Sequence, residues 1–520
     1  MTAFETFPEI LARQAALVPE RPCLIERERR LTYAETQAAV ERLAAGLAAR
    51  GLAPGDRLVA MFPGGIDYLL LWLAAARCGL ILVPVNETLR GRVLAHQLTL
   101  ADAAAVVLGP EQLLQVERDL PAEARPPGLI LHEAPEAAPD QGWAWTLPFA
   151  ALPAAPGADA PPRLQPWDPA AIYFTSGTTG PSKGVLYAHG QALATARPMA
   201  EALAEGEVFY FCYPLFHVSV PHMIGATLLR AGSVALRRRF SIGAFWDDVR
   251  HFGATATMML GAIAGFVEGQ PPAAGDRDHP LRRVLMVPLV RDPPAFCTRF
   301  GVTLMTWFNM TETSTPLHSD GFRRLEGTSC GRPREGVEAR IVDETDRPLP
   351  PGAVGELVLR WQRPWEMNLG YWRNPEKTVE AWRNLWFHTG DAFRADAAGN
   401  FYFVDRKSDS IRRRGENISS YEIEAEALDH PAVVECAAVA VPGAADDVEV
   451  KLVACLAPGE SLTPAALLAF LEPRLAPHML PRYLELHGQE LPKTPTGKIR
   501  KAALRESGTT EAWDRKKETR

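Results

Sequence analysis

Two patterns of hydrophobic and polar residues alternate along the first part of this chain. Between residues 31 and 107, segments with apolar side chains every three or four positions, such as LTYAETQAAVERLAAGLAARG, alternate with short aliphatic runs such as RLVAMF, LILVPV and AAVVLG. The first pattern predicts amphipathic helices, and the second predicts buried strands. Their alternation predicts βα units that form a mostly parallel sheet.

The longest apolar stretch, YLLLWLAAARCGLILVPV, extends from Tyr68 to Val85. It contains a charge at Arg77 and a helix stop at Cys78-Gly79, whereas a membrane-spanning helix needs about 20 consecutive apolar residues. We therefore expect a buried helix followed by a strand, and no membrane span.

Beyond residue 107 the pattern changes three times. Residues 120–166 are rich in alanine and proline, which predicts an irregular surface connection. A second α/β series follows, with the strand candidates AAIYFT, VFYFCYPLF, TATMML, RRVLMVPLV and TLMTWF. Residues 331–394 contain short strands separated by turn residues, which predicts a small antiparallel unit. A last α/β segment carries the predicted helix SSYEIEAEALDHP and ends in a basic tail.

Composition and charge narrow the class of protein. With 520 residues, the chain is too long for one ordinary hydrophobic core, and 47% hydrophobic with 22% charged residues is typical of a folded globular protein. The formal net charge is −7, and the basic residues are scattered apart from small clusters at 237–239 and 412–414. Nucleic-acid binding is therefore not indicated.

The cysteines and the N-terminal segment indicate a cytoplasmic location. The cysteines are odd in number and never spaced as CxxC, which favours reduced thiols and argues against a zinc site; they are Cys23, Cys78, Cys212, Cys297, Cys330, Cys436 and Cys455. The segment MTAFETFPEILARQAALVPERP predicts an amphipathic helix with acidic residues. It lacks the basic start and the continuous apolar core of a signal peptide, so we expect no export.

A dense run of glycines and hydroxyl groups, YFTSGTTGPSKG, extends from Tyr173 to Gly184, after a predicted strand. Ligands gather at strand ends in open parallel sheets. Glycines allow close backbone approach and hydroxyl groups donate to phosphate oxygens. The candidates are Thr175, Ser176, Gly177, Thr178, Thr179, Gly180, Ser182 and Gly184, with Lys183 adding a positive charge. The run fits neither the Walker loop nor GxGxxG, and its composition alone also fits an ordinary loop.

Six motifs in order carry a resemblance to a known family. YFTSGTTGPSKGV is followed by PLFH, NMTET, HTGD, DRKSDSIRRRGENISSYEIE and PTGKIRK, between residues 170 and 501. The series resembles the adenylate-forming superfamily of acyl-CoA synthetases, non-ribosomal adenylation domains and luciferases. The resemblance implies an α/β fold with a large N-terminal domain, residues 1–406, made of two α/β subdomains and a small β-barrel. A small mobile α+β domain, residues 407–520, would carry the catalytic lysine.

The resemblance also implies the reaction and its cofactors. The carboxylate of a small acid attacks the α-phosphate of ATP, which gives an acyl-adenylate and pyrophosphate, and the acyl group then passes to coenzyme A. Such chemistry depends on charge screening and on the alignment of two anions. In NMTET, the resemblance implies that Thr311 binds the α-phosphate and that Glu312 is a ligand of Mg²⁺, which prefers oxygen ligands.

Further nucleotide contacts follow from the same resemblance. Trp307, Phe308 and Asn309 would line the adenine and acyl pockets, and Met310 would also contact the nucleotide. Phe308-Asn309 stands where Tyr-Gly is common in the family. Asp391 of HTGD would accept both ribose hydroxyls, and Arg406 of DRKSD would contact ribose or phosphate.

The C-terminal motifs imply a mobile domain. Lys498 of PTGKIRK would bridge the acid and the α-phosphate, and a mobile small domain would have to deliver it. The hinge is expected within DRKSD, where Ser408 departs from the family's usual Asp or Lys. Gly415 would allow close approach of the pantetheine arm of coenzyme A. The three preceding arginines fit either phosphate contacts or a solvated run of charge.

The candidates for the acid pocket come from several separate segments. His217 of PLFH would lie at its mouth, with Val218, Met259, Leu260, Gly261 and Phe308 as further candidates. The stretch LRRVLMVPLV replaces the family's usual Gly-Gly-Ala, and together with RFGVTLMTWFNMTET, NETLRGRVLAHQL and EAWDRK it most resembles the carnitine and crotonobetaine CoA ligase-like branch. That similarity suggests coenzyme A as the acceptor and an aliphatic or bulky acid, without establishing carnitine.

Two alternatives stay open at this point. An enzyme of the same superfamily could pass the acyl group to a carrier-protein thiol or to an amine. A non-catalytic ATP-binding module is the other class, which the joint presence of Glu312, Asp391 and Lys498 disfavours. A homodimer is a common state for soluble enzymes of this size.

Overall fold

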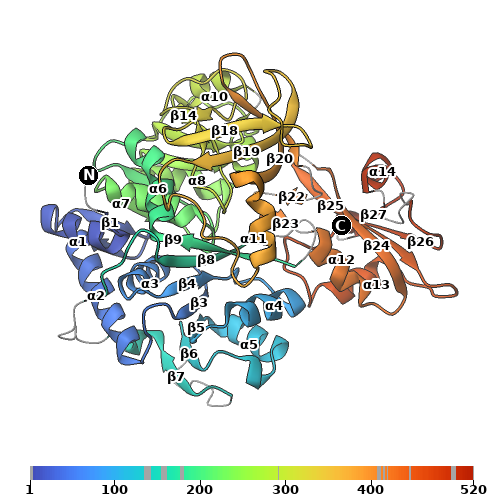
Figure 1. Ribbon diagram of the computed structural model, residues 1–520, viewed down its shortest axis with the longest axis horizontal. Coiled ribbons are helices and arrows are strands. Elements are labelled where there is room, and N and C mark those ends of the chain that lie inside the picture. The colour runs from blue at the N-terminus through green and yellow to red at the C-terminus, as the bar shows by residue number, and fades with distance from the viewer. Residues whose placement is uncertain are drawn as a thin grey trace.

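The computed structural model contains two large sheets, a small antiparallel unit and a C-terminal α+β unit (Figure 1). It describes residues 4–133, 142–153, 161–175, 181–290, 292–406, 411–413, 416–418, 420–443, 447–492, 499 and 501–518.

The first seven-stranded sheet is built mainly from the predicted βα units, in the order β7-β6-β5-β3-β4-β8-β9. Its pairs are parallel except for β8 with β9. The strands are β3 (Arg57–Met61), β4 (Ile81–Pro84), β5 (Ala105–Leu108), β6 (Gly128–Leu131), β7 (Trp145–Pro148), β8 (Pro169–Thr175) and β9 (Lys183–Ala188). The accompanying helices are α1 (Phe7–Leu17), α2 (Tyr33–Ala49), α3 (Ile66–Arg77), α4 (Gly91–Ala101), α5 (Pro110–Asp119), and the short η1 (Ala122–Ala124) and η2 (Phe149–Ala151).

Several local predictions are confirmed in this region. The N-terminal amphipathic segment is α1, which begins after a capping box between Thr6 and Glu9. The apolar stretch after residue 66 is the buried helix α3 followed by the buried strand β4. Within the described part of the chain, no helix combines the length and apolar character that crossing a membrane requires.

The expectation of an irregular connection over residues 120–166 was wrong in part. The segment contains β6 and β7, which extend the parallel sheet from β5. Strand β6 is fully buried and reads GLIL, too short a run to stand out among the surrounding alanines and prolines. Because parallel strands are buried on both faces, they need no alternating pattern that the sequence would reveal.

The second seven-stranded sheet has the order β14-β13-β12-β10-β11-β1-β2 and combines the second α/β series with an N-terminal hairpin. Its strands are β1 (Pro22–Ile25), β2 (Arg30–Thr32), β10 (Val208–Phe211), β11 (Ser233–Leu236), β12 (Ala256–Leu260), β13 (Arg283–Val287) and β14 (Thr303–Met305). Its helices are α6 (His189–Ala202), the π-helix η3 (Val220–Ile224), α7 (Gly225–Leu229), α8 (Ile242–Phe252), α9 (Gly261–Glu268) and α10 (Pro293–Phe300).

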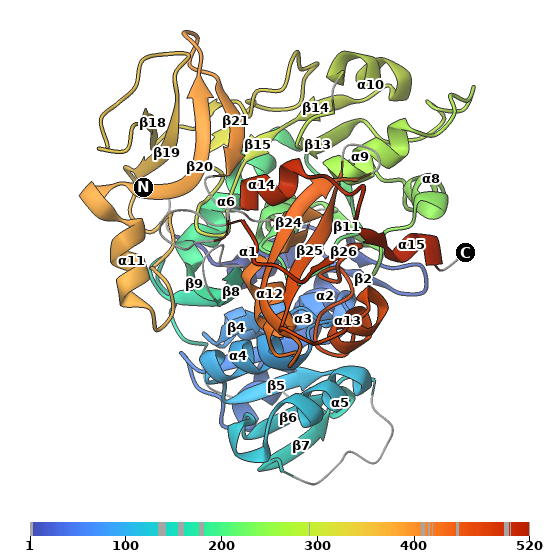
Figure 2. The same cartoon turned by 90° about the vertical axis from the view of Figure 1, so that its right-hand side faces the viewer.

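One hydrophobic core joins the two sheets. It includes Leu11 of α1, Leu43 of α2 and Met199 of α6 together with strand residues such as Leu58 of β3 and Phe209 of β10. Helices α1, α2 and α6 therefore pack between the sheets, and the C-terminal unit lies in front of the body in Figure 2.

The small antiparallel unit predicted for residues 331–394 is confirmed. Strands β18 to β21 form a four-stranded antiparallel sheet, and β15 to β17 form a small neighbouring one. The elements are β15 (Trp307–Phe308), β16 (Leu317–His318), β17 (Arg332–Pro333), β18 (Val337–Val342), β19 (Val354–Trp361), α11 (Pro375–Ala381), η4 (Arg383–Leu385), β20 (Phe387–Ala395) and β21 (Phe401–Arg406).

The C-terminal unit, called the lid below (residues 411–518), begins with a hairpin and continues as an α+β sheet, β24-β25-β26-β27. Its elements are β22 (Ile411–Arg413), β23 (Glu416–Ile418), α12 (Ser420–Leu428), β24 (Val433–Pro442), β25 (Val448–Leu456), α13 (Pro464–Leu471), β26 (Tyr483–His487), α14 (Lys501–Glu506), β27 (Trp513–Asp514) and α15 (Arg515–Glu518). Its apolar residues share a core with α4 and α5 of the N-terminal body. The expected hinge at Ser408 lies outside the described residues.

Candidate active site

The ends of the glycine-hydroxyl run lie at the edge of the first sheet. Thr175 is the last residue of β8, Lys183 is the first residue of β9, and the two are partners across the antiparallel pair. The hairpin therefore holds both ends of the loop together. The other predicted loop residues, Ser176, Gly177, Thr178, Thr179 and Gly180, lie outside the described residues.

Lys183 and Glu312 both contact Tyr371. The Lys183 ammonium lies 4.5 Å from the centre of the Tyr371 ring, a cation–π contact. The Tyr371 hydroxyl donates to Glu312 Oε1 over 2.9 Å. Burial, followed by the charge of Glu312, raises the pKa of Tyr371 well above its usual value, so its hydroxyl remains a donor. Tyr371 thus links the lysine of the loop to the predicted metal ligand.

The backbone around Glu312 is held from two sides. Its carbonyl accepts from Gln191 Nε2 over 3.2 Å and from Asn368 Nδ2 over 2.9 Å. The Thr311 carbonyl also accepts from Gln191. Since the Glu312 side chain is 6% exposed, its carboxylate has a fixed position near the loop. The described residues contain no cluster of three or more His, Cys, Asp or Glu that could hold a metal ion.

Asp391 lies on β20, where it is 3% exposed and is the register partner of Arg406 on β21. Its backbone N–H donates to the hydroxyl of Thr389. The structure therefore brings the two predicted ribose contacts to adjacent strands. The side chain of Arg406, like Gly415 and Lys498, lies outside the described residues.

The three residues before Thr311 face different surroundings. Phe308 packs edge-on against Phe393, with ring centres 4.8 Å apart. Met310 packs against the same small core. Asn309 instead turns its amide toward His222, at 2.9 Å. Asn309 is thus the member of the predicted adenine set that points toward the helical segment after His217.

A cavity of about 90 Å³ lies between the body and the lid and is lined by Thr175, Thr311 and His217 from the body and by Glu416 and His478 from the lid. His217 Nε2 and Glu416 Oε2 are 3.3 Å apart. Burial favours the neutral form of Glu416, but the charge of His217 and the hydrogen bond from it lower the pKa of this carboxyl to about 2. Glu416 is therefore an anion beside His217.

A second lid residue reaches the end of the loop. Glu422 of α12 accepts a hydrogen bond from the Ser182 backbone N–H, while burial raises the pKa of its carboxyl to about 7. His96 Nε2 lies 2.9 Å from the Ser182 carbonyl oxygen, and Gln97 donates to its hydroxyl. Residues of the body and the lid therefore converge on Ser182.

Sequence reasoning missed Tyr371, Glu416, Glu422 and His478 as site residues. Tyr371 stands in NLGYWRNPEKT, and Glu416 directly follows the predicted Gly415. A polar residue beside a predicted glycine was the available signal for Glu416. No local signal marks His478, because it joins the site only through the packing of the lid.

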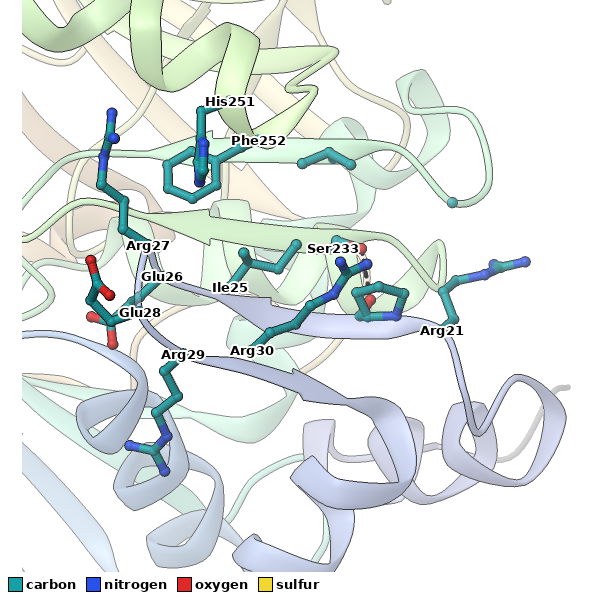
Figure 3. A pocket seen from close by; sticks show the side chains of 13 residues that line it. Arg21, Ile25, Glu26, Arg27, Glu28, Arg29, Arg30, Ser233, His251 and Phe252 are labelled. Carbon is teal, nitrogen blue, oxygen red and sulfur yellow. Dashed lines mark hydrogen bonds between the residues drawn. The ribbon is translucent and has the colours of Figure 1, made fainter.

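A larger cavity of about 620 Å³ lies elsewhere, along β1 and β2 and near α8 (Figure 3). Its labelled arginine side chains diverge. Arg21 pairs with Glu205, Arg27 with the buried Asp248, and Arg29 with Asp67. Since these three cations are already neutralised, this cavity lacks the convergent chemistry of the site at Thr311.

The chain belongs to the family of AMP-binding enzymes. The family model described as AMP-binding enzyme matches residues 11–372, and the model described as AMP-binding enzyme C-terminal domain matches residues 422–498. The chain is 32% identical over 491 residues to crotonobetaine/carnitine–CoA ligase of Salmonella paratyphi C, covering 92% of this chain and 93% of that protein. The resemblance to the superfamily and to this branch is confirmed.

Solved structures show the same fold. The o-succinylbenzoate CoA synthetase of Bacillus subtilis, bound with its product analogue, is 22% identical with a TM-score of 0.83, over 97% of this chain and 99% of that one. The amide bond synthetase of Marinactinospora thermotolerans is 25% identical over the same shares, with a TM-score of 0.83. An ATP-bound enzyme of Rhodopseudomonas palustris, 26% identical over the same shares, has a TM-score of 0.66.

Proposed function

We propose that this enzyme activates a small carboxylic acid with ATP and transfers the acyl group to coenzyme A. In the first step a carboxylate oxygen bonds to the α-phosphorus and pyrophosphate leaves. In the second step the thiol sulfur bonds to the acyl carbon, the bond to AMP breaks and the thiol proton passes to solvent. The observation that carries this proposal is the convergence of the loop ends, Thr311 and lid residues around one cavity, in a family of AMP-binding enzymes.

The nucleotide side supports the first step. In this proposal Thr311 and Lys183 bind phosphate oxygens and Asp391 binds the ribose hydroxyls. Glu312 fits Mg²⁺, because its Oε1 is engaged by Tyr371 while Oε2 makes no hydrogen bond among the described residues. When bound, Mg²⁺ neutralises phosphate charge, and in proteins it uses one or two carboxylates together with substrate phosphates. Lys498 would bring the remaining positive charge.

The lid contacts support the second step. Glu416 pairs with His217 at the cavity between lid and body, and we propose that this pair holds the lid in the arrangement for thiol transfer. The thiol would enter through this cavity, and Gly415, next to Glu416 in the sequence, would allow close approach. In the first step the lid would bring Lys498 to ATP by rotating about a hinge at Ser408 that separates residues 1–406 from 407–520.

Two half-reactions test this function separately. Exchange of labelled pyrophosphate into ATP that depends on an added acid is expected from the first step. Formation of a thioester with coenzyme A is expected from the second. Failure of exchange across a broad acid panel would contradict the proposal. Exchange followed by transfer only to an amine or a carrier-protein thiol would replace coenzyme A as the acceptor.

We also propose a cytoplasmic location and a homodimer. The seven cysteines are all unpaired thiols, as expected in a reducing compartment. Twofold dimers are the commonest oligomers of soluble proteins. Light scattering of the purified enzyme measures the oligomeric state, and a monomeric mass would contradict the dimer.

A further inference from the structure

A neutral polar cluster lies inward of the site, on the segment that follows His217. Phe216, His217 and Val218 line the cavity at Thr311, and the chain then enters the helical turn at Ser219 and the π-helix η3. His222 in η3 is 4% exposed, and its ring centre lies 5.6 Å from that of Trp307. Single π-helical turns occur frequently at functional sites.

The hydrogen bonds of Asn309 fix the orientation of its amide. Its Oδ1 accepts from the Thr315 backbone N–H over 2.8 Å and from the Thr313 hydroxyl over 3.0 Å. A backbone N–H can only donate, so this atom must be the oxygen. The amide nitrogen is then the donor toward His222 Nε2, at 2.9 Å.

The orientation of Asn309 determines the tautomer of His222. Because Nε2 accepts from the amide, a neutral imidazole carries its proton on Nδ1. Burial lowers the pKa of His222 to about 3, so the ring is neutral at physiological pH. Nδ1 makes no hydrogen bond within the described residues, so its N–H can donate to a ligand.

Ser219 adds a second polar atom without a partner. Its Oγ is buried and forms no hydrogen bond within the described part of the chain. It precedes His222 by three residues, less than one helical turn. Buried polar groups are normally hydrogen-bonded, and an exception calls for a ligand or a functional reason. Ser219 Oγ is such an exception, and the Nδ1–H of His222 on the same turn is a second polar group without a hydrogen bond among the described residues.

We infer that Ser219 and His222 bind the far end of the acid, and that this end carries a neutral acceptor, a hydroxyl or carbonyl oxygen. The inference rests on the proposed function, since it takes the acid to enter between His217 and Thr311. Asn309 then has two effects. It closes the space that a glycine would leave open, which limits the acid to a short chain, and it holds the His222 proton on Nδ1, toward the acid.

Because the cluster carries no charge, it disfavours acids whose far end is charged. The contacts of the cluster, Thr313, Thr315 and Trp307, are all neutral. A second carboxylate or a quaternary ammonium group would be buried here without a counter-ion, which is strongly unfavourable. The neutral cluster therefore distinguishes this enzyme from the crotonobetaine/carnitine–CoA ligases to which it is similar. Crotonobetaine and carnitine each carry a trimethylammonium group.

Matched acids in the pyrophosphate exchange assay test the inference. Short linear acids of equal length would end in a methyl group, a hydroxyl group, a methyl ketone or a trimethylammonium group. The oxygenated neutral acids are expected to exceed the alkyl acid about tenfold in kcat/KM, as one or two hydrogen bonds would give. Ser219→Ala and His222→Phe should each reduce that ratio without raising the KM for ATP.

The controls keep the outcomes distinct. Ser461→Ala makes the same chemical change at an exposed position of the lid and should leave the ratio unchanged. If His222→Phe does not fold, Ser219→Ala still tests the claim by deleting one hydroxyl. Exchange without discrimination, or a preference for the alkyl or trimethylammonium acid, would overturn this inference but leave the proposed function standing. Absence of exchange with every acid would overturn both.

Discussion

The two sides of the site differ in the kind of contact that each provides. On the proposed nucleotide side, Lys183, Tyr371 and Glu312 form a chain of charged and polar contacts. On the proposed acid side, Ser219, His222 and Asn309 form a neutral cluster, in which Ser219 Oγ and His222 Nδ1 make no hydrogen bond among the described residues. The charged side chains suit the phosphates of ATP, whereas the neutral cluster suits an uncharged organic group.

This difference separates reaction class from substrate identity. Charge stabilisation of phosphate requires particular residue types near particular atoms, so it leaves recognisable motifs. Discrimination between acids depends on small neutral contacts, each worth about 1 kcal/mol. Substitutions on the nucleotide side should therefore change the rate for every acid, whereas substitutions on the acid side should change the choice between acids.

The largest expected effect is that of Lys498→Ala. Loss of the charge that joins the carboxylate and the α-phosphate should reduce acid-dependent pyrophosphate exchange by about 10³-fold or more. A preformed acyl-adenylate should still react with coenzyme A at close to the wild-type rate. Lys493→Ala, another lysine in the same C-terminal region, is the matched control. Equal loss of both half-reactions in a folded Lys498→Ala variant would contradict a role of Lys498 that is specific to adenylation.

Glu312→Gln should have the next largest effect, about 100-fold on exchange, because an amide neutralises no metal charge. The loss should be the same for oxygenated and alkyl acids. Glu326→Gln, at an exposed position, provides the control. A loss confined to one class of acid would place Glu312 on the acid side and contradict the comparison.

Tyr371→Phe should act through Glu312. Removal of a group that orients a metal ligand typically costs 10-fold to 100-fold in metal affinity, so the Mg²⁺ concentration for half-maximal exchange should rise about tenfold. At saturating Mg²⁺ the rate should approach that of the wild type. Tyr402→Phe removes a similar hydroxyl–carboxylate bond, to Asp396, away from the site. An unchanged Mg²⁺ requirement in Tyr371→Phe would show that Tyr371 does not orient Glu312.

The smallest expected effect is a pH dependence of lid docking. Burial raises the pKa of Glu422 from 4.5 to about 7 in the docked lid. Between these values the docked state holds the extra proton, so docking should weaken as pH rises through this window and level off above it. Glu416 has the opposite shift, but its window lies below 4.5.

Fluorescence energy transfer between dyes on the lid and on the body would measure this docking. The wild type should lose transfer as pH rises from 4.5 to about 7, and Glu422→Gln should remove most of that slope. The variant isolates the contribution of Glu422. A slope that persists unchanged in Glu422→Gln would show that Glu422 does not cause the pH dependence of docking.

The sequence predicted the fold class and the family well, because both depend on contiguous patterns. Helix α3 with strand β4 and the motif around Thr311 could be read from neighbouring residues. The contacts that complete the site could not: Tyr371 is 59 residues from Glu312, Asn309 is 87 residues from His222, and Glu416 is 199 residues from His217. Only the packing of separate elements brings these pairs together.

Asn309 shows most clearly which features of the site could not be predicted from the sequence. It could be recognised as a departure from the family's usual glycine, and its effect on the adenine or acyl pocket could be anticipated. The direction of its amide could not, because that depends on Thr315 and on η3. The strands β6 and β7 were missed for a related reason, since short parallel strands show no alternation.

The separation of the two sides is tested most directly by one set of kinetic measurements. The ratio of kcat/KM for an oxygenated acid and its alkyl counterpart would be determined by pyrophosphate exchange in the wild type, Tyr371→Phe and Ser219→Ala. Tyr371→Phe should slow both acids equally and keep the ratio, whereas Ser219→Ala should lower the ratio and keep the KM for ATP. A changed ratio in Tyr371→Phe, or an unchanged ratio in Ser219→Ala, would contradict the account.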